Sequence, residues 1–289
     1  MRLRTALFGV LLFLQSALVL TGGAVRLTGS GLGCPTWPEC TPGSYTPVPY
    51  QAEGQLHAWI EFGNRLLTFA LLFSALAAVI YVLKSGRKDL RSLAAGQVLG
   101  IIGQGILGGI TVLTDLHPLP VAGHLLLSML LIAGATSLYS RRHEPHVKVS
   151  APTKTVSLLS RTHIAISFIV LILGTIVTGS GPHAGDEKAQ RFGFDIRSVA
   201  ILHADAVIFL MGLTIALLVA ASVTRSTKKA IYIFFGISLV QGGVGYAQYL
   251  TGIPELLVAI HLAGATIFWI AAWRIRLSVV QTSQQERDK

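Results

Sequence analysis

Two copies of one stretch govern how this chain can fold. Residues 104–125 read QGILGGITVLTDLHPLPVAGHL, and residues 241–262 repeat them without a gap as QGGVGYAQYLTGIPELLVAIHL. Ten of the 22 aligned positions are identical, including a Gln-Gly-x-x-Gly start and a histidine near the end, His124 and His261. Internal duplication in an apolar chain is typical of membrane proteins built from two halves. An imidazole kept at one place in both halves indicates a paired metal or haem function.

The composition is that of a membrane protein. Of the 289 residues, 52% are hydrophobic and 12% are charged, and the mean hydropathy is +0.64. A helical span needs about 20 largely uncharged residues, and eight runs meet that need. They cover residues 6–25, 57–83, 93–113, 119–139, 157–177, 199–222, 230–250 and 255–273. The sequence therefore predicts an all-α polytopic membrane protein with eight transmembrane helices, short loops and no soluble domain.

The basic residues predict the orientation of the spans. The first run is too long for a signal-peptide core and lacks an Ala-x-Ala cleavage site, so we expect it to stay as a span. Of the 23 Lys and Arg residues, 18 lie in five segments that fall on one side of the membrane. The positive-inside rule makes that side cytoplasmic and places both termini there. The net charge of +10 is thus a topology signal with anionic lipid as its partner, and no nucleic acid is needed to explain it.

The duplication extends to the first spans of the two halves. Leu-Thr-Gly-Ser-Gly at 27–31 matches Val-Thr-Gly-Ser-Gly at 177–181, where the first and fifth runs end. We therefore expect two homologous four-helix bundles. Their expected bounds are 1–142 for the N-terminal half, 143–156 for a cytoplasmic linker, 157–277 for the C-terminal half and 278–289 for a cytoplasmic tail.

Three histidines are expected at one depth near the outer face. His124, His203 and His261 stand early in the fourth, sixth and eighth runs, about one to two turns inside the outer end at 1.5 Å per residue. Asn64 precedes His124 by 60 residues and His203 precedes His261 by 58. Asn64 is therefore the positional counterpart of His203.

Glu61 breaks the symmetry of the halves, because its counterpart is Ala200. A carboxylate at membrane depth is costly and is a functional candidate. The alternative is a structural ion pair, since Glu61 and Arg65 have the i,i+4 order that favours pairing on a helix, and both roles are compatible. The asymmetry indicates that the first half performs chemistry while the second holds an electron-transfer cofactor.

The two cysteines of the chain lie in the first outer loop, in GLGCPTWPEC at residues 31–40. Outside the cytoplasm, Cys34 and Cys40 are expected to form a disulfide. A structural disulfide and a redox-active pair are both open. Two sulfurs alone do not complete a metal shell.

These features together resemble haem A synthase of the compact bacterial kind. The resemblance rests on Gly-x-Gly-Cys-Pro-x-Trp-Pro-x-Cys after the first span, on Glu-Phe-x-x-Arg in the second, and on histidines opening the fourth, sixth and eighth. It runs from about Val19 to Trp273. It implies an enzyme that oxidises a methyl group of haem O to the formyl group of haem A by successive hydroxylations.

The same resemblance implies roles for individual residues. His203 and His261 are the expected axial ligands of a haem b cofactor, and His124 is an expected iron ligand for the substrate haem O. Glu61 matches the catalytic glutamate, while Arg26 and Arg65 are expected near haem propionates. The family's other ligand is a histidine three residues after that glutamate, and this chain has Asn64 there.

Asn64 leaves two interpretations of the first half. In one, His124 alone holds haem O and one iron position is open. In the other, His57, two turns earlier on the same helical face, supplies a ligand. We favour the first, because His57 is expected about 10 Å nearer the outer surface. The plain role for His57 is a hydrogen bond or a propionate contact.

The expected setting follows from the resemblance. It implies a multi-pass protein of the bacterial cell (inner or plasma) membrane that meets haem O synthase, a farnesyltransferase, and terminal oxidase during assembly. A homo-oligomer is left open. The alternatives are a b-type haem electron carrier or haem-handling membrane protein, which has no need for Glu61, and a transporter. A transporter is disfavoured because the prolines cluster in loops rather than at mid-membrane.

Overall fold

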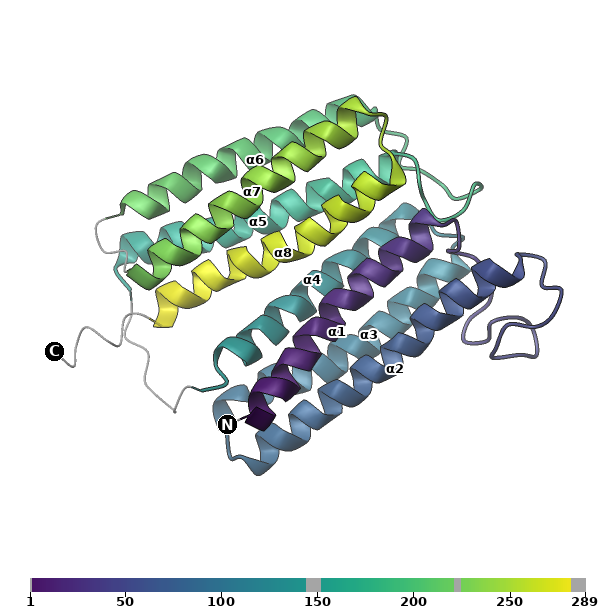
Figure 1. Cartoon of the computed structure of the whole chain (residues 1–289), viewed down its shortest axis with the longest axis horizontal. Coiled ribbons are helices and arrows are strands. Elements are labelled where there is room, and N and C mark those ends of the chain that lie inside the picture. Colours follow the sequence, from purple (N-terminus) through teal and green to yellow (C-terminus); the bar gives the residue numbers. More distant parts are fainter. Residues whose placement is uncertain (1, 144–151, 221–224, 282–289) are drawn as a thin grey trace. The chain divides into compact units, whose positions relative to one another are not determined.

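The computed structural model describes residues 2–143, 152–220 and 225–281 (Figure 1). Eight helices in these ranges are long and apolar enough to cross a membrane, and the ranges contain no β-strand. The helices are α1 (Arg2–Leu27), α2 (Gln55–Lys84), α3 (Arg91–Leu113), α4 (Pro118–Ser140), α5 (Lys154–Ser180), α6 (Ile196–Val219), α7 (Arg225–Leu250) and α8 (Glu255–Gln281), with a short 3-10 helix η1 (Lys88–Leu90) before α3. The prediction of an all-α protein with eight spans is confirmed.

The helix ends differ from the predicted spans mainly on the side with many basic residues. The predicted run 230–250 becomes α7 from Arg225, and the run 255–273 becomes α8 as far as Gln281. Helical hydrogen bonding continues past the apolar stretch because Lys and Arg side chains extend toward water from a helix end. Of the predicted linker and tail, residues 144–151 and 282–289 lie outside the described residues.

The chain divides into two compact units. The first comprises Met1–Tyr139 together with Thr175–Ile196, and the second comprises Ser140–Gly174 with Arg197–Lys289. The first unit thus contains α1 to α4 together with the last residues of α5 and the segment that follows it. The second contains most of α5 and nearly all of α6, together with α7 and α8.

The core of the first unit is built from apolar side chains and close helix contacts. Gly100 of α3 lies against Leu131 of α4, so closely that a Cβ at Gly100 would be 2.2 Å from the leucine side chain. Such small residues let helices approach in an apolar environment. The buried cluster consists of Phe8, Leu11, Leu71, Ala75, Ala78, Val82, Leu90, Ala94, Ile101, Leu131, Ala135 and Leu138.

A buried hydrogen-bonded chain crosses this core. The Gln15 amide nitrogen donates to Oε1 of Gln97 at 2.9 Å, and Nε2 of Gln97 donates to the Leu131 carbonyl at 3.0 Å. Both glutamines are at most 3% exposed. Buried amides require such partners, so this chain links α1, α3 and α4.

The second unit buries a histidine by similar means. Nε2 of His163 in α5 lies 3.1 Å from the Thr214 hydroxyl in α6, and the His163 ring meets Phe234 of α7 edge to face. Phe234 in turn stacks near Phe268 of α8. His163 therefore serves as a packing residue that joins three helices.

The Gln15–Gln97 chain yields a stability prediction. Gln97→Leu should lower the free energy of unfolding in detergent micelles by about 1–3 kcal/mol, because the Gln15 amide and the Leu131 carbonyl lose their partner. Leu99→Ala, on the same helix with a side chain 69% exposed, is the control and should change it by less than about 0.5 kcal/mol. Equal effects of the two substitutions would contradict a bonding role for Gln97.

Candidate functional site

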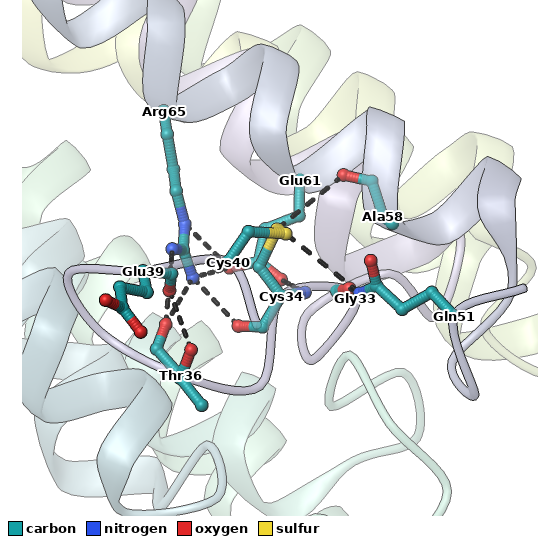
Figure 2. Close-up of polar contacts among 9 residues, drawn as sticks. All are labelled: Gly33, Cys34, Thr36, Glu39, Cys40, Gln51, Ala58, Glu61 and Arg65. Atoms are coloured by element: carbon teal, nitrogen blue, oxygen red, sulfur yellow. Dashed lines mark hydrogen bonds and ion pairs between the residues drawn. A yellow bond between two sulfur atoms is a disulfide. The ribbon is translucent and has the colours of Figure 1, made fainter. Parts of the chain in front are cut away.

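The loop between α1 and α2 folds back onto α2 around the disulfide (Figure 2). Cys34 and Cys40 are bonded to each other and are both fully buried. The predicted disulfide is therefore confirmed. The Cys34 sulfur also lies 3.9 Å from the Ala58 carbonyl oxygen in α2. The bridge is thus packed against the helix rather than exposed at the loop surface.

Glu61 holds the loop to α2 through both carboxylate oxygens. Its Oε2 accepts a 2.7 Å hydrogen bond from the Cys34 backbone N–H, and its Oε1 accepts from Arg65 at 2.6 Å and 3.1 Å. Glu61 is 6% exposed, and no other Asp or Glu of the described residues is buried. The predicted i,i+4 ion pair is present, and its carboxylate also accepts a hydrogen bond from the backbone of a disulfide cysteine.

Arg65 donates its other N–H groups to backbone carbonyls of the loop (Figure 2). Its Nη2 donates to the Cys34 carbonyl at 2.8 Å, and its Nη1 donates to the carbonyls of Thr36 and Glu39, each at 3.2 Å. Its guanidinium also lies over the Trp37 ring, 5.3 Å from the ring centre. Every guanidinium nitrogen of Arg65 therefore has a protein acceptor.

Two glycines permit the close packing of this loop. A Cβ at Gly33 would be 2.3 Å from the His57 carbonyl oxygen, and a Cβ at Gly109 of α3 would be 2.4 Å from the Trp37 ring. Any other residue would force backbone or indole to move. Trp37 thus lies between the Arg65 guanidinium and α3, and the loop contacts both α2 and α3.

His57 and Asn64 make separate contacts on either side of Glu61 in α2. Nδ1 of His57 lies 2.9 Å from the hydroxyl of Ser30, a fully buried loop residue. Oδ1 of Asn64 accepts a 2.7 Å hydrogen bond from the Thr21 hydroxyl of α1. His57 is therefore part of the loop attachment, whereas Asn64 belongs to the contact between α1 and α2.

Arg26, near the end of α1, lines a pocket of the first unit. Its guanidinium donates to the Thr178 carbonyl at 2.8 Å and to the His183 carbonyl. No acidic side chain of the described ranges pairs with it. The other walls of the pocket include Leu116, Val121, Leu125, Thr178 and Gln190. Because Val121 and Leu125 flank His124 in α4, an anionic group here would be close to that helix turn.

Three candidate ligand histidines share one packing arrangement. Each ring lies against a glycine of the preceding helix, and the Cε1 atom is 3.3–3.4 Å from the place a Cβ would take. Nδ1 of each ring is buried without a hydrogen-bond partner among the described residues. The pairs are Gly108 with His124, Gly174 with His203 and Gly245 with His261.

The repeated Gln-Gly-x-x-Gly motif produces two of these contacts. Nε2 of Gln104 donates to the His124 carbonyl at 3.1 Å, and Nε2 of Gln241 donates to the His261 carbonyl at 2.9 Å. The last glycine of each copy lies opposite the imidazole ring. The motif thus fixes the histidine backbone and leaves room for its ring.

These imidazoles fit axial ligands of a haem iron. A partly buried imidazole nitrogen without a hydrogen bond is costly in an apolar environment. Nδ1 of each of the three rings lacks a hydrogen-bond partner in the described part of the chain, and the His203 ring also interacts with the Val170 backbone. Coordination by iron would satisfy one nitrogen and orient the ring. His203 and His261 belong to one unit, as two ligands of one iron would have to.

Sequence reasoning missed several residues that shape these sites. Trp37 and Gly109 meet across two elements, and Thr21 reaches Asn64 from another helix. The spacing of these residues in the sequence does not predict that they are in contact. The glycines opposite the rings had a signal in the repeat itself, because Gly108 and Gly245 occupy the same position of the duplicated motif.

Comparisons with known proteins agree with this arrangement. The family model described as cytochrome oxidase assembly protein matches residues 5–185. A haem A synthase of Sinorhizobium fredii is 26% identical over 92% of this chain and 87% of its own length. Those of Rhizobium leguminosarum and Shewanella oneidensis are each 25% identical, over 92% and 91% of this chain and 88% and 92% of their own lengths.

The buried ion pair yields a double-mutant prediction. Arg65→Met should lower the free energy of unfolding by about 3–5 kcal/mol, because it leaves the Glu61 carboxylate buried without its cation. The double variant Glu61→Gln/Arg65→Met should recover part of that loss. Chemical unfolding in detergent micelles measures all three proteins.

The control is a second ion pair, between Arg87 and Asp89 near η1. Arg87→Met removes the same kind of side chain from a pair whose carboxylate is 22% exposed, against 8% for Glu61, so we expect a loss of about 0–1 kcal/mol. If Arg65→Met costs no more than Arg87→Met, Arg65 does not anchor the loop.

Proposed function

This chain belongs to the family of cytochrome oxidase assembly proteins, and on that premise we propose that it acts as a haem A synthase. The observation that carries the proposal is the similarity to proteins of that name over about nine-tenths of the chain and of their own length. The reaction would convert a methyl group of haem O to a formyl group by successive hydroxylations. It links the chain to assembly of cytochrome oxidase.

We assign the resident cofactor, haem b, to the second unit. His203 and His261 would hold it. Their Nδ1 atoms without hydrogen-bond partners in the described residues, and the glycines opposite their rings, support this role. When bound, the haem would supply one-electron transfer. Gly174 and Gly245 have no side chain, so the two rings can lie close to the preceding helices without being displaced.

We assign the substrate haem O to the first unit. His124 would bind its iron, and Arg26 would bind a propionate in the pocket beside α4. Arg26 suits a propionate better than Arg65, because Arg26 lines this pocket whereas the Arg65 guanidinium is already paired with the Glu61 carboxylate. The apolar walls of the pocket would exclude water from the porphyrin edge.

Glu61 is the proposed catalytic residue of the first unit. It is the only buried carboxylate of the described residues, and it stands three residues before Asn64, about one helical turn away. A carboxylate there can take up or release protons as the substrate is oxidised. Arg65 and the Cys34 N–H would hold its two oxygens in position, so the disulfide loop would act on the reaction through Glu61.

The topology and partners are also part of the proposal. The chain would lie in the bacterial cell membrane with both termini cytoplasmic, so that the disulfide loop is outside. The halves 1–142 and 157–277 would be the substrate and cofactor halves. Contact with haem O synthase and assembly as a homo-oligomer are further proposals.

Expression in a host that makes haem O but no haem A tests the function. Membranes with this protein should contain haem A or its hydroxymethyl precursor, detected by chromatography and mass spectrometry of extracted porphyrins. Glu61→Gln should abolish both products while the haem B content stays unchanged. Asp205→Asn, which neutralises a carboxylate of α6 that faces outward, is the control and should retain product.

The same experiment separates the alternative function. Haem B alone in the unaltered protein, with a reduced spectrum that Glu61→Gln leaves unchanged, would exclude a haem A synthase. A b-type electron carrier would then remain.

The cofactor site yields a second prediction. His261→Ala should reduce the haem B bound per purified chain at least twofold, because the iron loses an axial ligand. His163→Ala removes a buried histidine that already has a protein partner and should leave the haem B content unchanged. Pyridine haemochrome spectra measure both, and equal haem B in both variants would contradict the assignment.

A further inference from the structure

The first unit repeats the glycine contact with a different side chain. In each of the helix pairs α1/α2, α3/α4, α5/α6 and α7/α8, a glycine of the first helix lies beside a polar side chain of the second. Three of these side chains are imidazoles, and the fourth is the amide of Asn64, whose Nδ2 lies 4.0 Å from the place of a Cβ at Gly22. The contact supports the spacing argument that makes Asn64 the counterpart of His203.

The Asn64 amide is held in one orientation by Thr21. The Thr21 hydroxyl donates to Oδ1 of Asn64 at 2.7 Å, so the amide oxygen has a partner. Nδ2 makes no hydrogen bond in the described part of the chain and is not fully buried. An amide is not among the usual haem ligands, which are imidazole, thiolate, thioether and phenolate. Asn64 therefore presents an N–H donor where the other unit presents a ligand.

His57 is not placed to supply the missing ligand. Its Nδ1 is bonded to Ser30, which is in turn 2.8 Å from the Thr28 hydroxyl. It stands seven residues before Asn64, or about 10 Å along the helix. Its backbone carbonyl is also fixed against Gly33 of the disulfide loop. Moving His57 to the depth of Asn64 would break the attachment of the loop.

We propose that Asn64 leaves one iron position open in a haem bound at His124, and that its Thr21-held amide donates to a small neutral ligand such as dioxygen or carbon monoxide bound there. The inference rests on the proposed function, because it needs haem in the first unit. It deepens that function by naming the residues of the open side. Thr21 acts as a positioning residue for the amide.

Carbon monoxide is the probe for this inference. In the purified, dithionite-reduced full chain with both haems bound, carbon monoxide should bind to one of the two haems. The ferric protein should show one high-spin signal by electron paramagnetic resonance. Asn64→His should turn that signal low-spin and weaken carbon monoxide binding at least tenfold, with the haem content per chain unchanged.

Two further variants separate positioning from ligation. Thr21→Val and Asn64→Ala should retain carbon monoxide binding but shift its infrared stretching band to higher frequency, because the bound ligand loses a hydrogen-bond donor. His57→Ala should leave the spin state and the stretching band unchanged. Low-spin signals from both haems of the unaltered protein, or carbon monoxide binding that Asn64→His leaves unchanged, would overturn the inference.

The double variant His203→Ala/His261→Ala separates this inference from the proposed function. It leaves only the haem of the first unit, which should still bind carbon monoxide. A six-coordinate, unreactive haem in that variant would overturn the inference alone. A chain that holds no haem there would overturn the inference together with the assignment of haem O to the first unit.

Discussion

Polar groups placed among apolar helices are costly until they are hydrogen-bonded or coordinated, and this constraint explains much of how the protein is built. Gln15 and Gln97 satisfy each other across three helices, and His163 finds Thr214. Glu61 and Arg65 satisfy each other and the backbone of the disulfide loop. The exceptions that we connect with function are the imidazoles of His124, His203 and His261, whose Nδ1 atoms have no hydrogen-bond partner in the described residues.

The same constraint supports the roles that we propose for the two units. In the second unit, His203 and His261 would hold the resident haem, and Nδ1 of each ring has no hydrogen-bond partner among the described residues. In the first unit, one imidazole is accompanied by an amide held by Thr21 and by a buried carboxylate one turn away. A site with one iron ligand, one hydrogen-bond donor and one group that can carry protons is suited to oxidise the haem bound there. A site with two iron ligands is suited to transfer electrons.

The sequence predicted much of the fold and part of the site. The eight spans followed from apolar runs, the disulfide from two cysteines in an outer loop, and the Glu61–Arg65 pair from its i,i+4 spacing. The ends of α7 and α8 could not be predicted from the apolar runs, because each run ends at the first charged residue whereas the helical hydrogen bonding continues beyond it. The contacts of Trp37 with Gly109 and of Thr21 with Asn64 join distant segments, so only the folded chain reveals them.

The assignment of two haem sites is best tested by an experimental structure of the full protein purified from cells that make haem O. We expect two porphyrins, one held by His124 with the Asn64 amide near its iron, and the other held by His203 and His261. A single porphyrin, or an iron coordinated by other residues with these three imidazoles unbound, would contradict this assignment.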